Sequence, residues 1–267
     1  MVAPVLLDFQ GYWQLRYLWY RGAPKGGLVM PTDMMIRRLR VNSTLSEDSA
    51  AALRALPSVV RDLSEGTVFV REGDRPTQCC VIMSGFAFRS KVTMDGKRQI
   101  LSFHPAGDLP DLQGVFLERM DHDLATLSRA KMGFIEHRHI KQLIETRPAI
   151  VQALWRETLV DAAIFREWIV SLGARSATAR LAHLLAELRQ RLAAVGLVAD
   201  DEFEFPITQS ELGEALGISA VHVNRVIAEF RASGVLDIRR NQVRLKDFER
   251  LVEIGGFNEL YLHQQQQ

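Results

Sequence analysis

Cysteine is scarce in this sequence, and the charge balance favours neither sign. The chain of 267 residues has two cysteines, too few for a disulfide framework, a four-cysteine zinc site or a four-cysteine iron–sulfur cluster. With 33 Lys and Arg against 32 Asp and Glu, it is neither a polycationic coat for nucleic acid nor a strongly acidic binder. Any nucleic-acid site must therefore be a local patch.

Long apolar runs are also missing. No stretch approaches the roughly 18 consecutive apolar residues of a membrane-spanning helix. The N-terminal apolar run breaks off at Asp8 and has no basic lead, so it is a poor signal peptide. These absences predict a cytoplasmic protein with no membrane partner, and the length allows two domains of ordinary size.

Residues 1–30 differ in composition from the rest of the chain. Most of the tryptophan and tyrosine falls here without a regular period, and several glycines follow. We interpret this segment as an extension outside the folded unit, either disordered or the product of a start assigned too early. The alternative is an aromatic arm that binds a partner.

Short β-prone runs separated by glycines follow a helix predicted over 43–56. Asp95-Gly96, between two of these runs, is a favoured pair for a two-residue hairpin turn. Regular short strands with glycine turns predict an antiparallel β-roll of the jelly-roll type. The predicted strands cover residues 67–70, 79–83, 86–92, 98–103, 123–129 and 132–136.

A helix predicted over 149–172 is apolar around most of its circumference. Its polar residues form a narrow, drifting stripe of Gln152, Arg156, Glu157, Asp161, Arg166, Glu167 and Ser171. Such a helix needs two partners, and we expect the β-domain on one side and the same helix of a second subunit on the other. The alternative is a core helix within a monomer. Ser176 can cap a further helix, and the polar residues 200–202 predict a linker.

The most specific pattern lies in residues 206–246. Thr208 and Glu211 form a capping box, in which each side chain binds a free backbone N–H at a helix start. Gly217 can end that helix in a left-handed conformation, and Ser219 can cap a second helix with buried positions at helical spacing. Two short helices joined by so tight a turn predict a helix-turn-helix.

Two short strands around Arg240-Asn241 predict a β-hairpin wing after the second helix. Although the domain as a whole is not basic, residues 219–246 carry six basic residues against two acidic ones. Positive charge therefore gathers where a recognition helix and its wing would meet DNA phosphates. The alternative is a helical hairpin with no DNA role.

The second helix would enter the major groove of DNA with its N-terminal half. There Arg225 can contact a guanine edge through two hydrogen bonds, and Asn224 can pair with an adenine edge. The other outward positions, of which the first two could pack on a thymine methyl group, are Ala220, Val221 and His222. The candidates for phosphate contacts, which position the protein without specifying sequence, are Gln209, Ser219 and Arg240.

Taken in order, these segments resemble the Crp/Fnr family of bacterial transcription regulators over roughly residues 35–250. The β-domain is similar to the family's effector domain in the motifs Gly66-Thr-Val-Phe-Val-Arg-Glu-Gly-Asp74, Val81-Ile-Met-Ser-Gly85, Asp95-Gly-Lys-Arg-Gln-Ile-Leu101 and Pro105-Ala-Gly-Asp108. Helix 149–172 is similar to the family's dimerisation helix, and Leu216-Gly-Ile-Ser-Ala-Val-His-Val-Asn-Arg225 to its recognition motif. The resemblance implies a homodimer that binds two-fold symmetric DNA, responds to a signal in the β-roll and works with RNA polymerase.

The resemblance also places a candidate effector pocket at Gly107, Asp108, Leu109 and Leu124. Members that bind cyclic AMP have Gly-Glu-Leu, a short helix, and then an Arg-Ser or Arg-Thr pair that holds the phosphate. Here Gly-Asp-Leu is followed by a proline, and Leu124 stands where the arginine should be. A buried phosphate without that arginine would lose a charge-assisted pair, so we expect no tight binding of cyclic AMP. A true cyclic-nucleotide receptor is the alternative, with possible substitutes at Arg89, Arg119 and His122.

Two further chemistries are weighed against this resemblance. Oxygen sensors of the family carry an N-terminal cysteine cluster, which is excluded because no cysteine precedes Cys79. Cys79 and Cys80 lie next to each other on a predicted strand, so their side chains point to opposite faces and we expect buried thiols, not a redox switch.

His137-Arg-His139 has the spacing of a cupin metal site, which would suggest a cupin-like enzyme with a helical domain. Because this pair falls at the start of a helix without further ligands, we expect surface or capping histidines.

We therefore predict an α+β DNA-binding regulator that is not an enzyme and has no cofactor. The predicted order is an extension over 1–30, a β-roll sensory domain over 31–147, a dimerisation helix over 148–172, a winged helix-turn-helix over 173–255 and a tail over 256–267. Its predicted partners are double-stranded DNA, a second copy of the chain through residues 149–172, and RNA polymerase.

Overall fold

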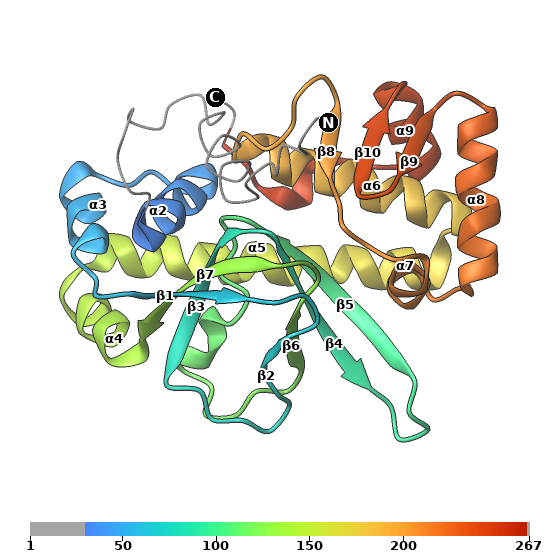
Figure 1. Ribbon diagram of the computed structural model, residues 1–267. Coiled ribbons are helices and arrows are strands. Elements are labelled where there is room, and N and C mark those ends of the chain that lie inside the picture. Colours follow the sequence, from blue (N-terminus) through green and yellow to red (C-terminus); the bar gives the residue numbers. More distant parts are fainter. Residues whose placement is uncertain (1–29, 266–267) are drawn as a thin grey trace, which may run out of the picture.

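The computed structural model describes residues 30–265, in which a β-roll and a helical domain flank one long helix (Figure 1). The interpretation of residues 1–30 as an extension therefore falls almost entirely outside the described residues. No helix within residues 30–265 is long and apolar enough to cross a membrane.

Two helices precede the β-roll. α2 (Pro31–Asn42), which was not predicted, starts with a proline, whose fixed φ suits the first turn of a helix, and packs on β3 and β7. α3 (Glu47–Arg54) lies inside the predicted range 43–56. Ser46 caps it by accepting a hydrogen bond from the backbone N–H of Ser49.

The β-roll consists of two antiparallel sheets with strand orders β1-β7-β3 and β2-β6-β4-β5. The strands are β1 (Val59–Leu63), β2 (Val68–Val70), β3 (Gln78–Ser84), β4 (Phe86–Val92), β5 (Arg98–Pro105), β6 (Asp123–Thr126) and β7 (Ala130–Glu136). Each predicted run overlaps one of them, with β3, β5 and β7 extending beyond their runs, so the prediction of a β-roll is confirmed. β1 was missed because Val59 and Val60 are both exposed, and no alternation of buried and exposed residues marks the strand.

The hairpin of β4 and β5 projects beyond the rest of its sheet (Figure 1). Its turn is not the predicted two-residue turn. The backbones of Thr93 and Lys97 are hydrogen-bonded, and the three residues between them form the loop. Gly96 has a φ of +80°, which is the left-handed position that closes a three-residue hairpin loop.

A short connection leads from the β-roll to the long helix. It is formed by α4 (His137–Thr146), which follows β7, whereas the 3-10 helix η1 (Leu112–Val115) lies within the β-roll between β5 and β6. α5 (Pro148–Ala174) then spans the width of the molecule between the β-roll and the helical domain (Figure 1). Its 27 residues correspond to a length of about 40 Å. α5 contains the helix predicted over 149–172.

The C-terminal domain combines helices with a third sheet of order β8-β10-β9. Its elements are α6 (Ala177–Ala194), β8 (Glu202–Glu204), α7 (Gln209–Leu216), α8 (Ala220–Ala232), β9 (Leu236–Arg239), β10 (Gln242–Leu245), α9 (Phe248–Gly255) and η2 (Glu259–Leu262). The linker predicted around residues 200–202 is wrong in part, because Glu202 begins β8, which pairs with β10. Leu262 is buried in this domain, so the packed part extends beyond residue 255, where the sequence placed its end.

One hydrophobic core runs through both domains. Phe103 of β5 makes edge-to-face contacts with Phe205, at 5.1 Å between ring centroids, and with Trp168 of α5, at 5.8 Å. The same core includes the buried leucines of α6 and the apolar side of α8. Because burial of shared apolar surface is the main stabilising contribution to packing, the helical domain is docked against the β-roll along β5.

Candidate nucleic-acid interface and effector region

Local hydrogen bonds set the two helices of the helix-turn-helix. The Thr208 hydroxyl accepts from the backbone N–H of Glu211 at 3.2 Å, and the Glu211 carboxylate accepts from the backbone N–H of Thr208 at 2.9 Å. Gly217 ends α7 with a φ of 65°, and Ser219 caps α8. A Cβ on Gly213 would lie 2.6 Å from the carbonyl oxygen of Ile218, so the turn requires glycine here. The predicted helix-turn-helix is confirmed.

α8 lies at the outer edge of the molecule with one side free (Figure 1). Its inner side packs into the domain through Val223, Val226, Ile227 and Phe230. The predicted base-reading residues lie on the opposite side, where Val221 is 79% exposed and Asn224 and Arg225 are also exposed. Ala220 and His222 are partly exposed beside them. The structure therefore brings these five residues together on one accessible helix face.

Arg225 is oriented by its neighbours on α8. Its Nη2 lies 2.9 Å from His222 Nε2, and its Nε lies 3.9 Å from the Glu229 carboxylate. Residues three and four positions apart are adjacent on a helix surface, so these contacts follow from the spacing. The guanidinium group stays exposed and is available to a ligand.

The wing carries fewer free cations than its sequence suggests. Arg231 and Arg239 both bind Asp237, and Arg244 forms an ion pair with Glu202. Arg240 is exposed at the tip between β9 and β10, with a φ of 54°, and has no ion pair within residues 30–265. Of the predicted phosphate contacts, Gln209 and Ser219 are likewise exposed at the N-terminal ends of α7 and α8.

The outer face of α5 is largely apolar, although Arg166 is also exposed there. Four large side chains there are largely exposed, at 64% for Trp155, 55% for Leu159, 69% for Ile169 and 48% for Val170. By contrast, Glu157 is buried against α2. The polar stripe of α5 thus lies partly inside the molecule, and residues 30–265 leave one side of this helix uncovered.

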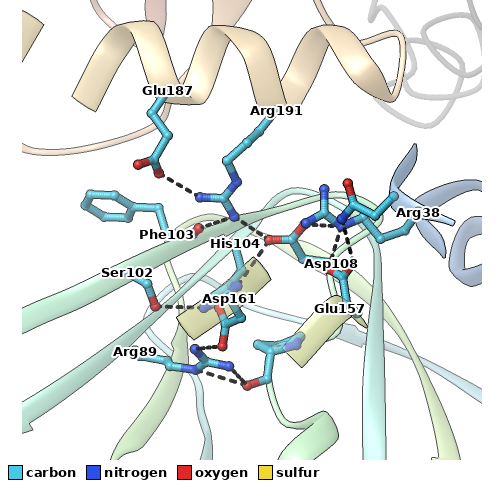
Figure 2. Close-up of polar contacts among 12 residues, drawn as sticks. Arg38, Arg89, Ser102, Phe103, His104, Asp108, Glu157, Asp161, Glu187 and Arg191 are labelled. Atoms are coloured by element: carbon cyan, nitrogen blue, oxygen red, sulfur yellow. Dashed lines mark hydrogen bonds and ion pairs between the residues drawn. The ribbon is translucent and has the colours of Figure 1, made fainter. Parts of the chain in front are cut away.

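Of the predicted effector residues, Asp108 lies where the β-roll meets α2, α5 and α6 (Figure 2), with Gly107 and Leu109 next to it in the chain, whereas Leu124 lies apart on β6. Gly107, with a φ of +101°, turns the chain after β5 and leads into Asp108, which is 5% exposed. The Asp108 carboxylate lies 2.6 Å from Arg191 Nη2 and 3.5 Å from Arg38 Nε. His104 Nδ1 lies 3.1 Å from the same carboxylate. This acidic side chain is therefore fully engaged by groups of its own chain.

Each of the two arginines around Asp108 also binds a buried glutamate. Arg38 Nε donates to Glu157 at 2.7 Å, and Arg191 Nη1 donates to Glu187 at 3.1 Å. Burial raises the pKa of both glutamates. Burial acts in the same direction on Asp108, but the guanidinium groups of Arg191 and Arg38 outweigh it and hold the pKa of Asp108 well below its usual range.

Sequence reasoning named Asp108 but missed these partners. The weak signal for them is a charged residue at an otherwise apolar helix position. Arg191 sits among the buried leucines of α6, and Glu157 interrupts the apolar pattern of α5. Buried charges are stable only when paired, so each such residue needed a partner that local spacing does not identify.

Leu124 stands where members that bind cyclic AMP have the arginine that holds the phosphate, and Arg89 lies beside it. Leu124 packs with Val70 and Met120 in a small separate cluster, and Arg89 is its cross-strand neighbour on β4. The Arg89 side chain is 3% exposed and donates to the Pro110 carbonyl at 3.0 Å and to Asp161 of α5 at 2.6 Å. This cation is therefore already occupied.

The other two substitutes are also held by the protein. Arg119 donates to the carbonyl oxygen of Gly73 at 3.2 Å, and His122 lies 2.7 Å from the Asp121 carboxylate. The cavity lined by Asp108, Leu109 and the arginine pairs has a volume of about 20 Å³, which is room for a water molecule. Ligand pockets typically measure about 300–1,000 Å³.

His104 gives this region a pH dependence that can be measured. Burial and the nearby Arg89 lower the pKa of His104 from 6.5 to about 4. Below pH 6.5 the unfolded chain therefore binds more protons than the folded chain, and the free energy of unfolding falls as the pH drops toward 4. When the pH falls from 7 to 4.5, the free energy of unfolding should drop in both proteins. We expect the drop to be about 2–3 kcal/mol smaller for His104→Gln than for the unsubstituted protein.

Urea unfolding of both proteins at the two pH values checks this expectation. Burial raises the pKa of Asp111 to about 6, which works in the opposite direction. Asp111 is present in both proteins, so the comparison isolates His104. An identical loss of stability in the two proteins would contradict the assignment.

The cysteine pair and the histidine pair considered in the sequence analysis lie on β3 and at the start of α4. Cys79 and Cys80 are free and fully buried on β3, and burial raises the pKa of both thiols. His137 and His139 lie in the first turn of α4, as predicted, but the expectation of a surface or capping histidine is wrong for His137, which is 8% exposed because it packs close to Gly114. Within the described residues no group of three or more His, Cys, Asp or Glu side chains is arranged to hold a metal ion.

Comparisons with known proteins match both domains. A model of the cyclic nucleotide-binding domain matches residues 60–147, and a model of the Crp-like helix-turn-helix domain matches residues 179–254. The transcriptional activator protein FnrL of Cereibacter sphaeroides is 25% identical over 228 residues, which cover 84% of this chain and 91% of that protein. The fumarate and nitrate reduction regulatory protein of Escherichia coli is 23% identical over 224 residues, covering 84% and 89%.

A solved structure shares the fold. FixK2 from Bradyrhizobium japonicum superposes with a TM-score of 0.69 at 19% identity, covering 74% of this chain and 98% of FixK2. The β-roll, the long helix and the winged helix-turn-helix thus follow one another in the same order as the two matched domain models. The chain belongs to the Crp/Fnr family of DNA-binding transcription regulators, which are not enzymes.

Proposed function

We propose that this regulator acts as a homodimer paired through α5, binds a two-fold symmetric DNA site with α8, and does not use cyclic AMP as its effector. The observation that carries the proposal is the exposed apolar face of α5 next to a free recognition helix. A contiguous apolar surface on one face of a soluble protein marks an interaction site.

The spacing along α5 fits a helix pair. The positions on its exposed side are separated alternately by three and four residues: Gln152, Trp155, Leu159, Ala162, Arg166, Ile169 and Gly173. This is the a and d spacing of a coiled coil, in which each side chain packs between residues of the facing helix. A second copy of α5 would thus cover Trp155, Leu159 and Ile169 at once.

Pairing through α5 makes the DNA-binding surface symmetric. A two-fold dimer presents two copies of α8, and such helices read half-sites about 34 Å apart, one turn of DNA. Arg225 and Asn224 would contact bases, and Arg240 with the N-terminal ends of α7 and α8 would contact phosphates. Because the similar FnrL is named a transcriptional activator, we extend the proposal to contact with RNA polymerase.

Selection from random duplexes tests the proposal directly. The protein is incubated with the library at about 0.1 M salt, because affinity for DNA falls steeply with salt. We expect the recovered sequences to share a two-fold symmetric motif, and sedimentation to show two chains per duplex. Recovery of asymmetric motifs bound by one chain, or of none, would refute it.

We expect no tight binding of cyclic AMP. The effector region holds space for about one water molecule, and Arg89 is bound to Asp161 and to a carbonyl oxygen. Binding would have to break these contacts before the phosphate gained a charge-assisted partner. Isothermal titration should show no saturable heat below millimolar nucleotide, and a sub-micromolar dissociation constant would overturn this part of the proposal.

A further inference from the structure

The buried charges around Asp108 form one continuous series that crosses both domains. It begins at Tyr261 of η2, whose hydroxyl donates to Glu187 at 2.9 Å. Glu187 accepts from Arg191, Arg191 donates to Asp108, and Asp108 contacts Arg38. From there the series continues to Glu157 of α5. Figure 2 shows its central members between α6 and the β-roll.

We propose that Asp108 is a positioning residue for the DNA-binding domain. It occupies the segment where nucleotide-binding relatives would hold a ligand, and through Arg191 it fixes α6 on the β-roll. The orientation of α8 then depends on an ion pair within the chain. This inference rests on the proposed function, since the consequence of orientation is read out as DNA affinity.

Arg191 is suited to this role by its place and by its hydrogen bonds. It lies near the C-terminal end of α6 in the helical domain, yet its Nη2 donates to the Phe103 carbonyl at 2.9 Å and to Asp108 at 2.6 Å. Both acceptors belong to the β-roll segment. The Arg191 side chain is 4% exposed, so water does not replace a lost partner.

A second contact joins β5 directly to the helix-turn-helix. At the opposite end of β5, Arg98 Nε lies 2.8 Å from the Glu214 carboxylate of α7. The Gln99 side-chain amide donates to the Glu214 carbonyl at 2.5 Å. β5 therefore holds the helical domain at both of its ends, and α7 is joined to α8 by a turn of only three residues, 217–219.

Removing Asp108 should release the end of β5 at Arg191. The Arg191 guanidinium group would keep Glu187 of its own helix and the Phe103 carbonyl, but it would lose its only ion pair with the β-roll segment, so the ion pair that remains no longer favours docking. The shared apolar core along β5 would remain, but the more exposed contact at Arg98 and Gln99 would be the polar contact left to fix the orientation of the domain on β5. Loss of a fixed orientation reduces the fraction of molecules in which two α8 helices fit one DNA site.

A double-mutant cycle tests the proposal on the full chain. Asp108→Asn, Arg191→Gln and the double variant are titrated with a duplex selected by the unsubstituted protein, and hydrogen exchange is followed in the absence of DNA. We expect each single variant to lose at least about tenfold in DNA affinity. The double variant should bind no more weakly than the weaker-binding single variant, because both substitutions remove the same contact between Asp108 and Arg191. Exchange should quicken in α7 and at Arg98 and Gln99, and stay unchanged in β3 and β7.

A matched control lies two residues away. Arg189 is also on α6, but it binds Asp201 of its own domain at 2.8 Å and does not contact the β-roll segment. Arg189→Gln should stay within about twofold of the original affinity, with unchanged exchange in α7, as expected for a partly exposed ion pair that lies within one domain. An equal loss in this variant would assign the effect to α6 as a whole and overturn the role of Asp108.

Further outcomes keep the proposal falsifiable. Folded Asp108→Asn protein with the original affinity and exchange would overturn it. Should Asp108→Asn not fold, Arg191→Lys keeps the charge but cannot reproduce the planar fork of donors, and original behaviour of that variant would overturn the proposal as well. Should the unsubstituted protein select no DNA, the proposed function fails, while the exchange measurement still decides whether Asp108 docks the domain.

Discussion

Leu159→Asp should prevent formation of the proposed dimer and weaken binding to the selected DNA by on the order of 100-fold or more. Leu159 is 55% exposed on the outer face of α5, and in a two-fold pair it would face its own copy at an a position. The substitution places two carboxylates opposite each other in a largely apolar seam, where like charges oppose pairing. Because two linked half-site contacts bind far more tightly than one, loss of pairing also lowers DNA affinity.

Sedimentation at several protein concentrations measures the first effect, and titration of the duplex measures the second. Val59 of β1 is a matched control, since it is 54% exposed but lies on the β-roll. Val59→Asp should leave both measurements unchanged. Leu159→Asp protein that still sediments as a dimer would show that α5 is not the seam.

Arg166 gives a test of opposite sign at the same face. It occupies an a position of the proposed seam, where it would face the same residue of the partner chain. Two like charges at a buried position oppose pairing. Arg166→Leu should therefore strengthen the dimer, seen as a dimer that persists at lower protein concentration.

Arg225→Ala should erase the preference for one base at one position of each half-site. An arginine bound to a guanine edge by two hydrogen bonds contributes about 1–3 kcal/mol of discrimination, so affinity for the selected duplex should fall by a factor of about 5 to 150. Affinity for unrelated duplexes should fall much less. Repeating the selection with the variant should return the same motif with that single position degenerate.

Arg240→Ala is the control for this prediction. Arg240 is exposed at the wing tip without an ion pair in the described part of the chain, and a phosphate contact carries no sequence information. Its loss should weaken binding to all duplexes alike and reduce the salt dependence by about one ion. An Arg225→Ala variant with the original sequence preference would mean that α8 does not dock through this residue.

Elements with local signals were predicted correctly. The helix-turn-helix depends on a capping box, a left-handed glycine and a second cap, all of which act within three or four residues. The strands of the β-roll follow from short β-prone runs between glycines. In the same way, the exposed face of α8 follows from the spacing of its buried residues.

Elements without local signals were missed or placed wrongly. β8 reads as an acidic linker because its pairing partner, β10, lies far along the chain. The hairpin turn at Gly96 has three residues, since the pairing of the flanking strands and not the turn dipeptide sets its length. The segment after residue 255 has few apolar residues, yet Tyr261 contacts buried Glu187.

The net charge of the chain is near zero, but its charges are used differently in the DNA-binding domain and in the buried region around Asp108. By itself the sequence determined that positive charge is concentrated in residues 219–246, because formal charges can be counted without a fold. Only the tertiary structure decided which cations are free, since Asp237 and Glu202 occupy three of the arginines, Arg231, Arg239 and Arg244. It also decided that Asp108 binds Arg191, a pairing between residues 83 positions apart, because burial makes each charge require a partner and only the fold brings that partner within reach.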